Sequence, residues 1–549
     1  MDVELVDLES AYQGVNDVIA NSIKENGKDE VIAHVINHER CSNDNLPSSE
    51  VQKDIRPNLK GDRLNVALLV LLYMLQGVPV GISFAIRTYM QNMKVSYVQQ
   101  AKFGVVDIPW SLKLLWAPLV DVMYSRRVGK RKTWLVPVEL CIGLLLIFVA
   151  PNIKWLMENE TRMTTLTCAF FILNVLAATN DIAVDGWTLT LLRKENLGYA
   201  STCNTSGQAL GVAFGYVLFI LLESEEFCNK WLRFTAQKGG IISMEGYLFF
   251  WGIIYSMVSA SIAVFVKEKC NQADKISKIN VKQMYKLLWK IINLRTMKVF
   301  TMVMLAYEFS FSSMGTSVSN PKFMEYGVAK EAMALVDLSL IPIKIFIPIF
   351  IAKYTSGPRP LKILYKTVPY WLVLGISSGV LVYYTPNFIS GEYSNWSFYY
   401  FVIFELHRIL RLVLLVAVYL SVRSFFLRIS DPRIGGTYMS LLNTVWYFGM
   451  AISRIVALGL LGLLTVKQCS TDREIKCLSK TANDEDCEKF AGDECIIVVD
   501  GYFVEVVFCT ISGVAWYLTL RKILENLQSR QLSDWQVNDD GLIHGVLHE

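Results

Sequence analysis

The amino-acid sequence predicts an all-α membrane protein of twelve transmembrane helices in two pseudo-symmetric six-helix bundles. Three observations predict this fold. The chain of 549 residues is 53% hydrophobic with a mean hydropathy of +0.36, which lies outside the range of soluble globular proteins. About twelve apolar segments reach the roughly 20 residues that a membrane-crossing helix needs. Two spaced motifs recur at nearly equal offsets, as in transporters built from two related halves.

The expected spans divide into two sets of six. They begin near Leu64, Val98, Leu135, Thr164, Gly198, Tyr247, Met297, Ala332, Leu361, Phe398, Gly435 and Gly501. We therefore expect a disordered cytosolic tail at 1–62, a first bundle at 63–266, a basic cytosolic linker at 267–296, a second bundle at 297–521 and a cytosolic tail at 522–549. The first tail holds no apolar run of signal-peptide type. The first span is therefore expected to direct membrane insertion.

The second half of the chain repeats features of the first. A Y-x-S-x-x-N-T motif opens the fifth and eleventh spans, 438 − 199 = 239 residues apart. Its copies are Tyr199, Ser201, Asn204 and Thr205, then Tyr438, Ser440, Asn443 and Thr444. Asp107 and Lys113 likewise correspond to Asp337 and Lys344, at offsets of 337 − 107 = 230 and 344 − 113 = 231. Chance can produce one such match, but two at similar offsets favour an internal duplication.

Small residues follow the first copy of the motif. Gly207, Gly211 and Gly215 repeat every four residues along the fifth span. This spacing lets two helix backbones approach closely, and it favours tight packing over the alternative of a gating hinge.

Basic residues concentrate in the linker and in the loops that follow even-numbered spans. The largest group lies between the second and third spans, at Arg126, Arg127, Lys130, Arg131 and Lys132. By the positive-inside rule, these loops and both termini face the cytosol. The odd-numbered loops carry sequons at Asn159 and Asn395, which are glycosylation candidates on the opposite side.

One odd-numbered loop, residues 466–500, is acidic and rich in cysteine. Its cysteines are Cys469, Cys477, Cys487 and Cys495. Four cysteines on the glycosylated side indicate two disulfides in one of three pairings, and hence an oxidising lumen.

Ionisable residues inside the spans are the strongest functional candidates, because each costs about 2.5–3.5 kcal/mol to insert without a partner or a watery cavity. Asp181 and Asp185 are four residues apart and share one helical face. They could bind a coupling proton, orient a substrate amine, or pair with Lys113 or another cation nearby. Lys113 and Lys344 hold matching places in the two halves, as a pseudo-twofold cavity requires, although lysines near helix ends also snorkel to the interface.

The tenth span adds a group of charges at Glu405, His407, Arg408 and Arg411. If Glu405 pairs with Arg408, then Arg411 and His407 have no acidic partner in this span. Glu308 in the seventh span could neutralise one of the remaining positive charges. With Arg87 and Arg454 also counted, cations outnumber anions, which suits an anionic substrate whose phosphates guanidinium groups can bind in bidentate fashion. The substrate-binding candidates are Lys113, Lys344, His407, Arg408, Arg411, Tyr199, Asn204, Tyr438 and Asn443.

The loop after the second span has the pattern of the major facilitator signature loop: an acid, an Arg-x-Gly step and a basic cluster. Asp121, Arg127 and Gly129 form its first part. An acid at a helix end can accept hydrogen bonds from a neighbouring helix N-terminus and pair with arginine, closing the cytosolic side in one state. The alternative is a basic membrane anchor without a gating role. The coupling or gating candidates are Asp107, Asp121, Arg127, Asp181, Asp185 and Glu308.

Motifs of bond-making chemistry do not occur in the sequence. We find no Walker A loop, no H-E-x-x-H, no G-x-S-x-G and no G-x-G-x-x-G after a strand. We therefore expect no enzymatic activity, no cofactor and no metal site. The net charge is only +4, so the overall charge gives no indication of a nucleic-acid partner.

Several longer stretches resemble one known family, the endoplasmic-reticulum acetyl-coenzyme A transporters of the major facilitator superfamily. They are residues 114–121, 134–137, 181–187, 195–204, 227–234, 353–358, 430–438 and 464–469. The resemblance implies the major facilitator fold, residence in the endoplasmic-reticulum membrane, and alternating-access import of acetyl-CoA from the cytosol for acetylation in the lumen. Acetyl-CoA carries a 3′-phosphate and a pyrophosphate, in agreement with the surplus of cations.

Two stretches, 307–320 and 446–450, depart from the family pattern and leave the acyl group open. The sequence is compatible with a carrier of another CoA thioester or phosphate-bearing organic anion. From a different class, it is compatible with a membrane-embedded acyltransferase using His407 as a base. Free CoA as a counter-substrate and a homo-oligomer are also open.

Overall fold

The structure is a computed structural model of the whole chain. It describes residues 59–92, 102–125, 127–157, 160–266, 268, 280–311, 316–328, 333, 336, 339–388, 398–469 and 495–537. Most of the expected first tail, both sequons, and Cys477 and Cys487 lie outside the described residues.

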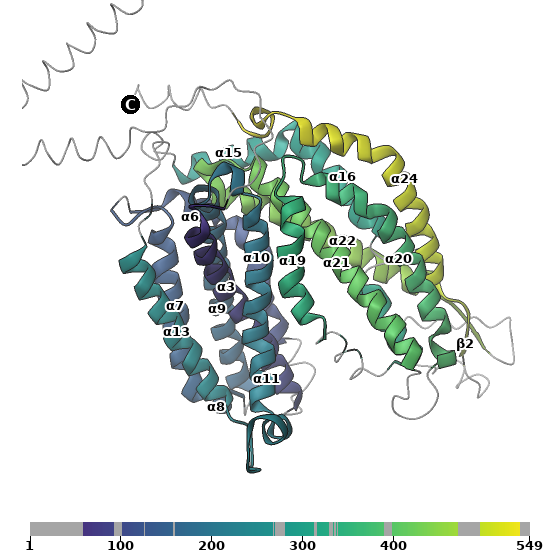
Figure 1. Cartoon of the computed structure of the whole chain (residues 1–549), viewed down its shortest axis with the longest axis horizontal. Coiled ribbons are helices and arrows are strands. Elements are labelled where there is room, and N and C mark those ends of the chain that lie inside the picture. The colour runs from purple at the N-terminus through teal and green to yellow at the C-terminus, as the bar shows by residue number, and fades with distance from the viewer. Residues whose placement is uncertain are drawn as a thin grey trace, which may run out of the picture. The chain divides into compact units, whose positions relative to one another are not determined.

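The first half is a group of long helices (Figure 1). They are α3 (Arg63–Asn92), α7 (Lys132–Val149), α9 (Glu160–Leu191), α10 (Tyr199–Val212), which continues through η5 (Ala213–Val217) into α11 (Leu218–Glu223), and α13 (Met244–Phe265). Shorter pieces are η1 (Gly104–Asp107), α5 (Ile108–Leu112), η2 (Lys113–Leu115), α6 (Ala117–Val122), η3 (Ala150–Asn152), α8 (Ile153–Met157), η4 (Lys194–Asn196), α12 (Glu225–Phe227) and η6 (Cys228–Leu232).

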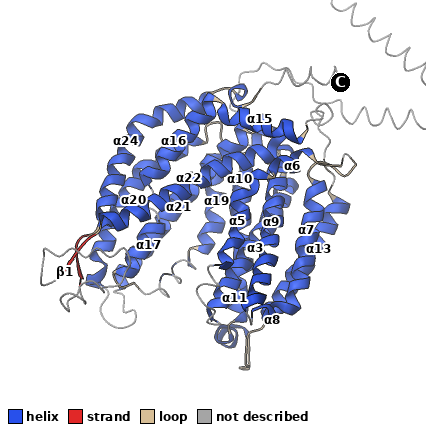
Figure 2. Ribbon diagram, turned by 180° about the vertical axis from the view of Figure 1, so that it is seen from behind, coloured by secondary structure: helices blue, strands red, loops and turns tan. Residues whose placement is uncertain are grey.

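The second half begins after the amphipathic helix α15 (Val281–Asn293), which lies in the expected linker. Its helices are α16 (Arg295–Phe311), α17 (Thr316–Glu325), α19 (Ile341–Thr355), α20 (Leu361–Phe388), α21 (Phe398–Ile429), η7 (Pro432–Ile434), α22 (Gly435–Leu464), α24 (Gly501–Ser529) and η8 (Leu532–Trp535). Two antiparallel strands, β1 (Val466–Cys469) and β2 (Cys495–Val499), border the cysteine-rich loop (Figure 2).

Eight helices in the described part of the chain are long and apolar enough to cross a membrane. The other four expected spans, the second, seventh, eighth and tenth, are helical as well. The second span is broken into short pieces because Pro109 and Pro118 begin new helices in α5 and α6. The seventh is described as α16 and α17, the eighth as the 15-residue α19, and the tenth as α21, which carries several charges.

The two halves show the internal duplication directly in their helices. Helices α9 and α21 end at Leu191 and Ile429, which are 429 − 191 = 238 residues apart, within one residue of the motif offset. The glycine repeat of α10 packs against α3: a Cβ on Gly211 would stand 2.0 Å from the Met74 carbonyl oxygen, and one on Gly77 would stand 2.3 Å from that of Gln208. The expectation of close helix packing is therefore confirmed.

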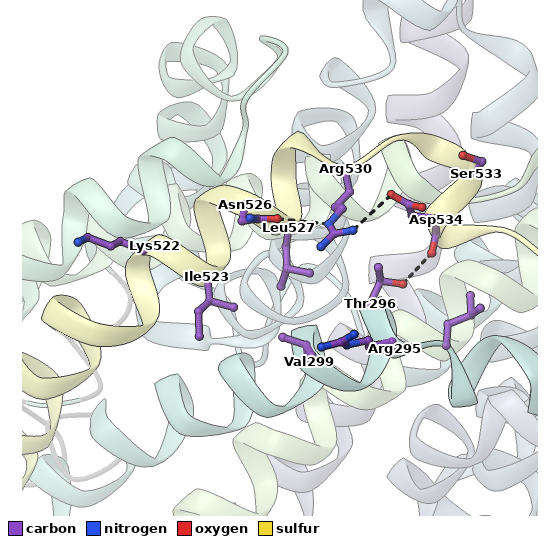
Figure 3. Close-up of a pocket in the computed structure, with 11 residues that line it drawn as sticks. Arg295, Thr296, Val299, Lys522, Ile523, Asn526, Leu527, Arg530, Ser533 and Asp534 are labelled. Atoms are coloured by element: carbon purple, nitrogen blue, oxygen red, sulfur yellow. Dashed lines mark hydrogen bonds and ion pairs between the residues drawn. The ribbon is translucent and has the colours of Figure 1, made fainter.

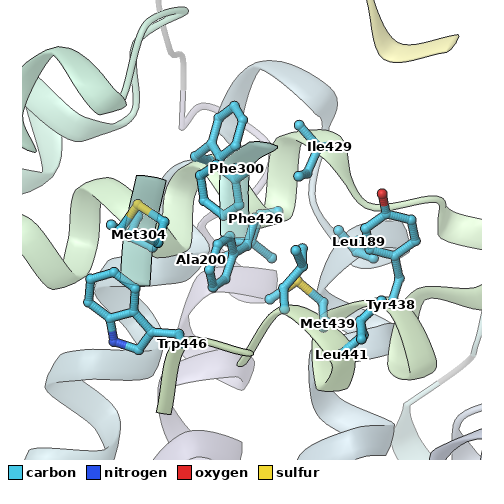
Figure 4. Packing of buried hydrophobic residues seen from close by; sticks show 14 of the residues in the cluster. Leu189, Ala200, Phe300, Met304, Phe426, Ile429, Tyr438, Met439, Leu441 and Trp446 are labelled. Atoms are coloured by element: carbon cyan, nitrogen blue, oxygen red, sulfur yellow. The ribbon is translucent and has the colours of Figure 1, made fainter. Parts of the chain in front are cut away.

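A single apolar cluster joins the two halves at the end where α6 and α15 lie (Figure 4). Leu189 and Ala200 come from α9 and α10 of the first half, whereas Tyr438 and Met439 come from α22 of the second. Polar contacts reinforce it at the same end, since the Tyr285 hydroxyl on α15 donates to the Leu115 carbonyl. The functional candidates must be placed relative to this shared end.

Candidate functional site

Asp185 on α9 joins the two halves of the molecule. Its carboxylate is fully buried. Oδ1 accepts hydrogen bonds from the Tyr73 hydroxyl on α3 at 2.9 Å and from Arg423 Nη2 on α21 at 2.7 Å, and Oδ2 accepts one from Asn443 Nδ2 on α22 at 3.2 Å. Arg423 is itself buried, and its Nη1 donates to the Tyr419 hydroxyl at 3.2 Å. A buried ion pair thus connects helices of both halves.

Asp181, one helical turn away, pairs inside the first half. It accepts from Lys113 Nζ, which the broken second span presents at the start of η2. Both side chains are 5% exposed or less, so Lys113 does not snorkel to the interface. Of the roles considered for the two aspartates, pairing with a cation is therefore realised for both.

The signature loop forms a second connection at the same end of the molecule. Asp121 Oδ1 pairs with Arg131 Nη1, and Oδ2 accepts from the Thr437 backbone N–H at 2.6 Å. Thr437 lies in the first turn of α22, where helical N–H groups have no partner within the helix. The expected contact between acid and helix N-terminus is present, but its arginine is Arg131. Arg127 is exposed.

The surroundings of this latch explain its charge state and its tight fit. Burial alone would raise the pKa of Asp121, but the charges of Arg131 and Lys130 and the hydrogen bonds from Thr437 outweigh burial and lower that pKa below its usual range. The Arg131 guanidinium lies over Gly186, where a Cβ would stand 2.4 Å from Cζ. The Lys130 ammonium adds a bond of 2.7 Å to the Arg433 carbonyl.

The repeated motif lies at the same contact between the halves. Asn443 binds Asp185, as described, and the Tyr438 hydroxyl donates to the Trp535 carbonyl at 2.6 Å. In the first copy, Tyr199 is half-buried and Asn204 is fully buried. Among the described residues, neither side-chain polar atom of Asn204 has a hydrogen-bond partner. The two copies are therefore equivalent in sequence but not in bonding.

The cations of the tenth span lie inside the second half. Arg408 Nη1 donates to Asn320 Oδ1 on α17 at 2.7 Å. Arg411 Nη1 donates to Ser378 Oγ on α20 at 3.1 Å, and His407 Nδ1 is 3.3 Å from Ser377 Oγ on the same helix. The structure therefore separates these three residues from the pairs that Asp181 and Asp185 make.

The remaining candidates are more exposed. Lys344 on α19 is exposed, and Glu308 on α16 is half-buried. Asp107 pairs with Arg87 at 2.6 Å, with side-chain exposures of 57% and 27%, respectively. An ion pair in such an environment contributes about 0–1 kcal/mol, so this contact is a weak constraint.

Glu139 on α7 is a buried carboxyl that the sequence reasoning did not single out. Its Oε1 accepts from Asn180 Nδ2 at 3.5 Å, while its Oε2 and Asn180 Oδ1 have no hydrogen-bond partner in the part of the chain that the structure describes. A proton on Oε2 would let these two atoms bond to each other and close a cyclic acid–amide pair. The geometry fits a neutral carboxylic acid.

Comparison with known proteins decides the family. The family model described as acetyl-coenzyme A transporter 1 matches residues 65–279 and 270–537. The chain belongs to this family. It is similar to an uncharacterized protein of Schizosaccharomyces pombe, 31% identical over 86% of this chain and 89% of that one. It is also similar to an uncharacterized membrane protein of Saccharomyces cerevisiae, 28% identical over 87% of this chain and 98% of that one.

Solved structures show the fold of this acetyl-coenzyme A transporter family member. The Escherichia coli fucose:proton symporter matches with a TM-score of 0.52 and 11% sequence identity, over 85% of this chain and 99% of that one. The anhydromuropeptide permease of Escherichia coli is 25% identical over 30% of this chain and 32% of that one. The chain is thus a membrane transporter with the major facilitator fold, and the family and fold exclude the acyltransferase alternative.

Two residues of this transporter's site escaped the sequence reasoning. Arg423 carried a usable signal, because it lies 238 residues after Asp185, within one residue of the motif offset. Arg131 carried none beyond its membership of a basic cluster. Choosing it over Arg127 requires the turn at Gly129, whose φ of 110° bends the loop so that Arg131 points to Asp121.

Proposed function

We propose that this transporter moves acetyl-CoA from the cytosol into the lumen of the endoplasmic reticulum by alternating access, and so supplies luminal acetylation. Family membership supports the substrate. The positive-inside rule supports a cytosolic position of the latched end, because that end carries Arg131 and the other basic residues of the signature loop.

The observation that carries the mechanism is the Asp185–Arg423 pair between the halves. Both side chains are buried, and separating them without replacement would leave two uncompensated charges, at about 3–5 kcal/mol for loss of one partner. A phosphate can replace the Asp185 carboxylate on Arg423, because guanidinium binds either group through the same pair of parallel N–H donors. The anionic substrate would then release the contact that holds the halves together.

Lys113 would supply a second cation to the substrate. It lies on the same side of α9 as the Asp185 contact, one helical turn away, and it is held by Asp181. A pyrophosphate carries enough charge to draw both cations from their carboxylates. Asp185 would keep the Tyr73 hydroxyl as a donor, which lowers the cost of losing Arg423.

Opening of the latched end would also require the Asp121 contacts to part. Two contacts must therefore break before this end opens. The substrate weakens the Asp185–Arg423 contact by replacing Asp185 on Arg423, and the Asp121–Thr437 bond then separates. This arrangement closes the end when the carrier is empty.

Uptake of labelled acetyl-CoA into proteoliposomes tests the proposal. We expect Arg423→Ala to reduce uptake at least tenfold, and Arg423→Lys to restore part of it because charge returns without the planar fork. Arg359→Ala, at an exposed site in the loop before α20, is the matched control and should transport normally. The contrary result is normal uptake by Arg423→Ala together with loss of uptake in the double variant Arg408→Ala and Arg411→Ala. This result would show that the substrate binds inside the second half.

A carrier of another CoA thioester or phosphate-bearing anion is the second candidate, favoured by the general affinity of these cations for phosphate. Competition of acetyl-CoA uptake by a panel of CoA esters, free CoA and nucleotides discriminates the two. Preference for acetyl-CoA supports the leading proposal. Stronger uptake after preloading with free CoA would identify exchange.

A further inference from the structure

A cavity of about 800 Å³ lies within the second half, where α16 begins and α24 ends (Figure 3). Arg295 and Thr296 line it from the first turn of α16, Lys522 from the second half of α24, Arg530 from the residue that follows α24, and Asp534 from η8. Its volume falls in the range of pockets that bind small molecules.

The walls of this cavity are fixed by the way the chain turns back after α24. Trp535 is buried, with its ring centroid 5.4 Å from that of Phe425 and 6.0 Å from that of Phe300. The Thr296 hydroxyl donates to the Asp534 carbonyl at 2.7 Å and ties η8 to α16. The cavity is thus a built feature of the second half.

The charge of the cavity is positive. Three cations face one carboxylate, and the Arg530–Asp534 pair is long at 4.0 Å. Within the described part of the chain, the side chains of Arg295 and Lys522 make no ion pair or hydrogen bond. Two uncompensated cations beside an apolar wall, which includes Leu527, fit a ligand with a phosphate and an apolar portion.

Helix α15 indicates the level of the cavity relative to the membrane. Its chain leads directly into α16, its apolar side is buried, and Trp289 on the other side is 68% exposed. Tryptophan favours the headgroup region of a bilayer. Lys282 and Lys286 are exposed on the same helix, as in segments that lie against anionic lipid.

We propose that this cavity, defined by Arg295, Lys522 and Arg530, binds a phosphate-bearing ligand outside the transport path. The phosphate comes from an anionic lipid headgroup or from a soluble phosphate ester, because both present the same oxygen atoms to the cations. A ligand there bridges α16 and α24 and stabilises the docked η8.

Binding of short-chain phosphatidic acid to the full-length protein in detergent, measured by native mass spectrometry, tests the proposal. Short-chain phosphatidylcholine is the zwitterionic comparison. We expect binding of phosphatidic acid to weaken on the order of 100-fold in the variant with Arg295→Gln, Lys522→Gln and Arg530→Gln, at roughly fivefold for each cation. Should this variant be poorly folded, Lys522→Gln alone should weaken binding about fivefold.

The matched control carries Lys353→Gln, Lys362→Gln and Lys366→Gln, which remove the same charge from exposed sites outside the cavity and away from α15. It should bind phosphatidic acid as the unsubstituted protein does. Equal weakening in both triple variants, equal binding of the two lipids, or no binding of phosphatidic acid overturns the proposal.

Glycerol 3-phosphate then distinguishes the two sources of phosphate. Displacement of phosphatidic acid at similar concentrations identifies a soluble phosphate ester as the natural ligand, and failure to displace it identifies the lipid headgroup. Neither result depends on acetyl-CoA transport.

Discussion

Asp185 and Arg423 occupy equivalent positions in the two halves and bond to each other. Each lies six residues before the end of its helix (191 − 185 and 429 − 423), and Arg423 Nη2 is 2.7 Å from Asp185 Oδ1. Equivalent positions on duplicated helices meet near a pseudo-twofold axis. Because the two residues at these positions carry opposite charges, they form an ion pair that connects the halves.

Exchange of these two charges tests the bond. Asp185→Arg or Arg423→Asp alone should destabilise the protein by about 3–5 kcal/mol, since each leaves like charges buried together. The double variant should recover much of the lost melting temperature. The corresponding exchange at the more exposed Arg87–Asp107 pair is the control and should change stability by less than about 1 kcal/mol. A double variant no better than either single variant would refute the pairing.

Gly186→Ala should weaken the latch of the signature loop. The new methyl group would occupy the position of the Arg131 guanidinium, which must then leave Asp121. We expect a cysteine placed at Thr437 to react faster with a water-soluble thiol reagent in this variant. Gly459→Ala is the control, because a Cβ at Gly459 meets open space. Unchanged labelling in Gly186→Ala would show that Arg131 finds another route to Asp121.

The latch should be insensitive to pH between 5 and 8. The pKa of Asp121 is lower in this conformation than its ordinary value of about 3.9. Its stabilisation is therefore fully present above the ordinary value and is lost only as pH falls through the lowered one. The thiolate is the reacting form of cysteine and its fraction rises with pH, so the labelling rate at Thr437→Cys is divided by the rate at the exposed Arg127→Cys at the same pH. This ratio should stay flat in this window. A titration there would assign the latch to a different group.

Glu139→Gln should preserve the stability of the first half. The amide of glutamine can donate to Asn180 Oδ1 and accept from Asn180 Nδ2, as a neutral carboxylic acid would. Glu139→Ala leaves Asn180 unsatisfied and should cost about 1–3 kcal/mol, visible as a lower melting temperature. A large loss of stability in Glu139→Gln would mean that the carboxyl is charged and paired.

The backbone register of β1 and β2 selects one disulfide pairing from three. Cys469 is opposite Cys495 in the register, and directly opposed residues have Cα atoms about 4.5–5.5 Å apart, within the range a disulfide spans. We predict the pairs Cys469–Cys495 and Cys477–Cys487. Peptide mapping without reduction should recover these two pairs. A peptide joining Cys469 to Cys477 or Cys487 would contradict the register.

Much of the architecture could be predicted from local patterns. Apolar length places α3, α7, α9, α13, α20 and α24 close to the expected starts, because a helix in lipid must satisfy its own backbone whatever surrounds it. The repeated motif and its offset revealed the two halves, because a duplicated sequence keeps the spacing between its motifs. The acid of the signature loop was also recognised, because the order of an acid, an Arg-x-Gly step and a basic cluster can be read from neighbouring residues alone.

Partner choice among charged residues came from tertiary structure alone. The surplus of cations in the tenth span suggested Arg408 and Arg411 as substrate ligands, yet these contact α17 and α20, whereas Arg423 faces Asp185. Counting charges cannot reveal which side of a helix faces another helix. The sequence by itself determined a duplicated membrane transporter of known family, whereas tertiary packing decided which acid binds which base, because ion pairing depends on contacts between helices far apart in the chain.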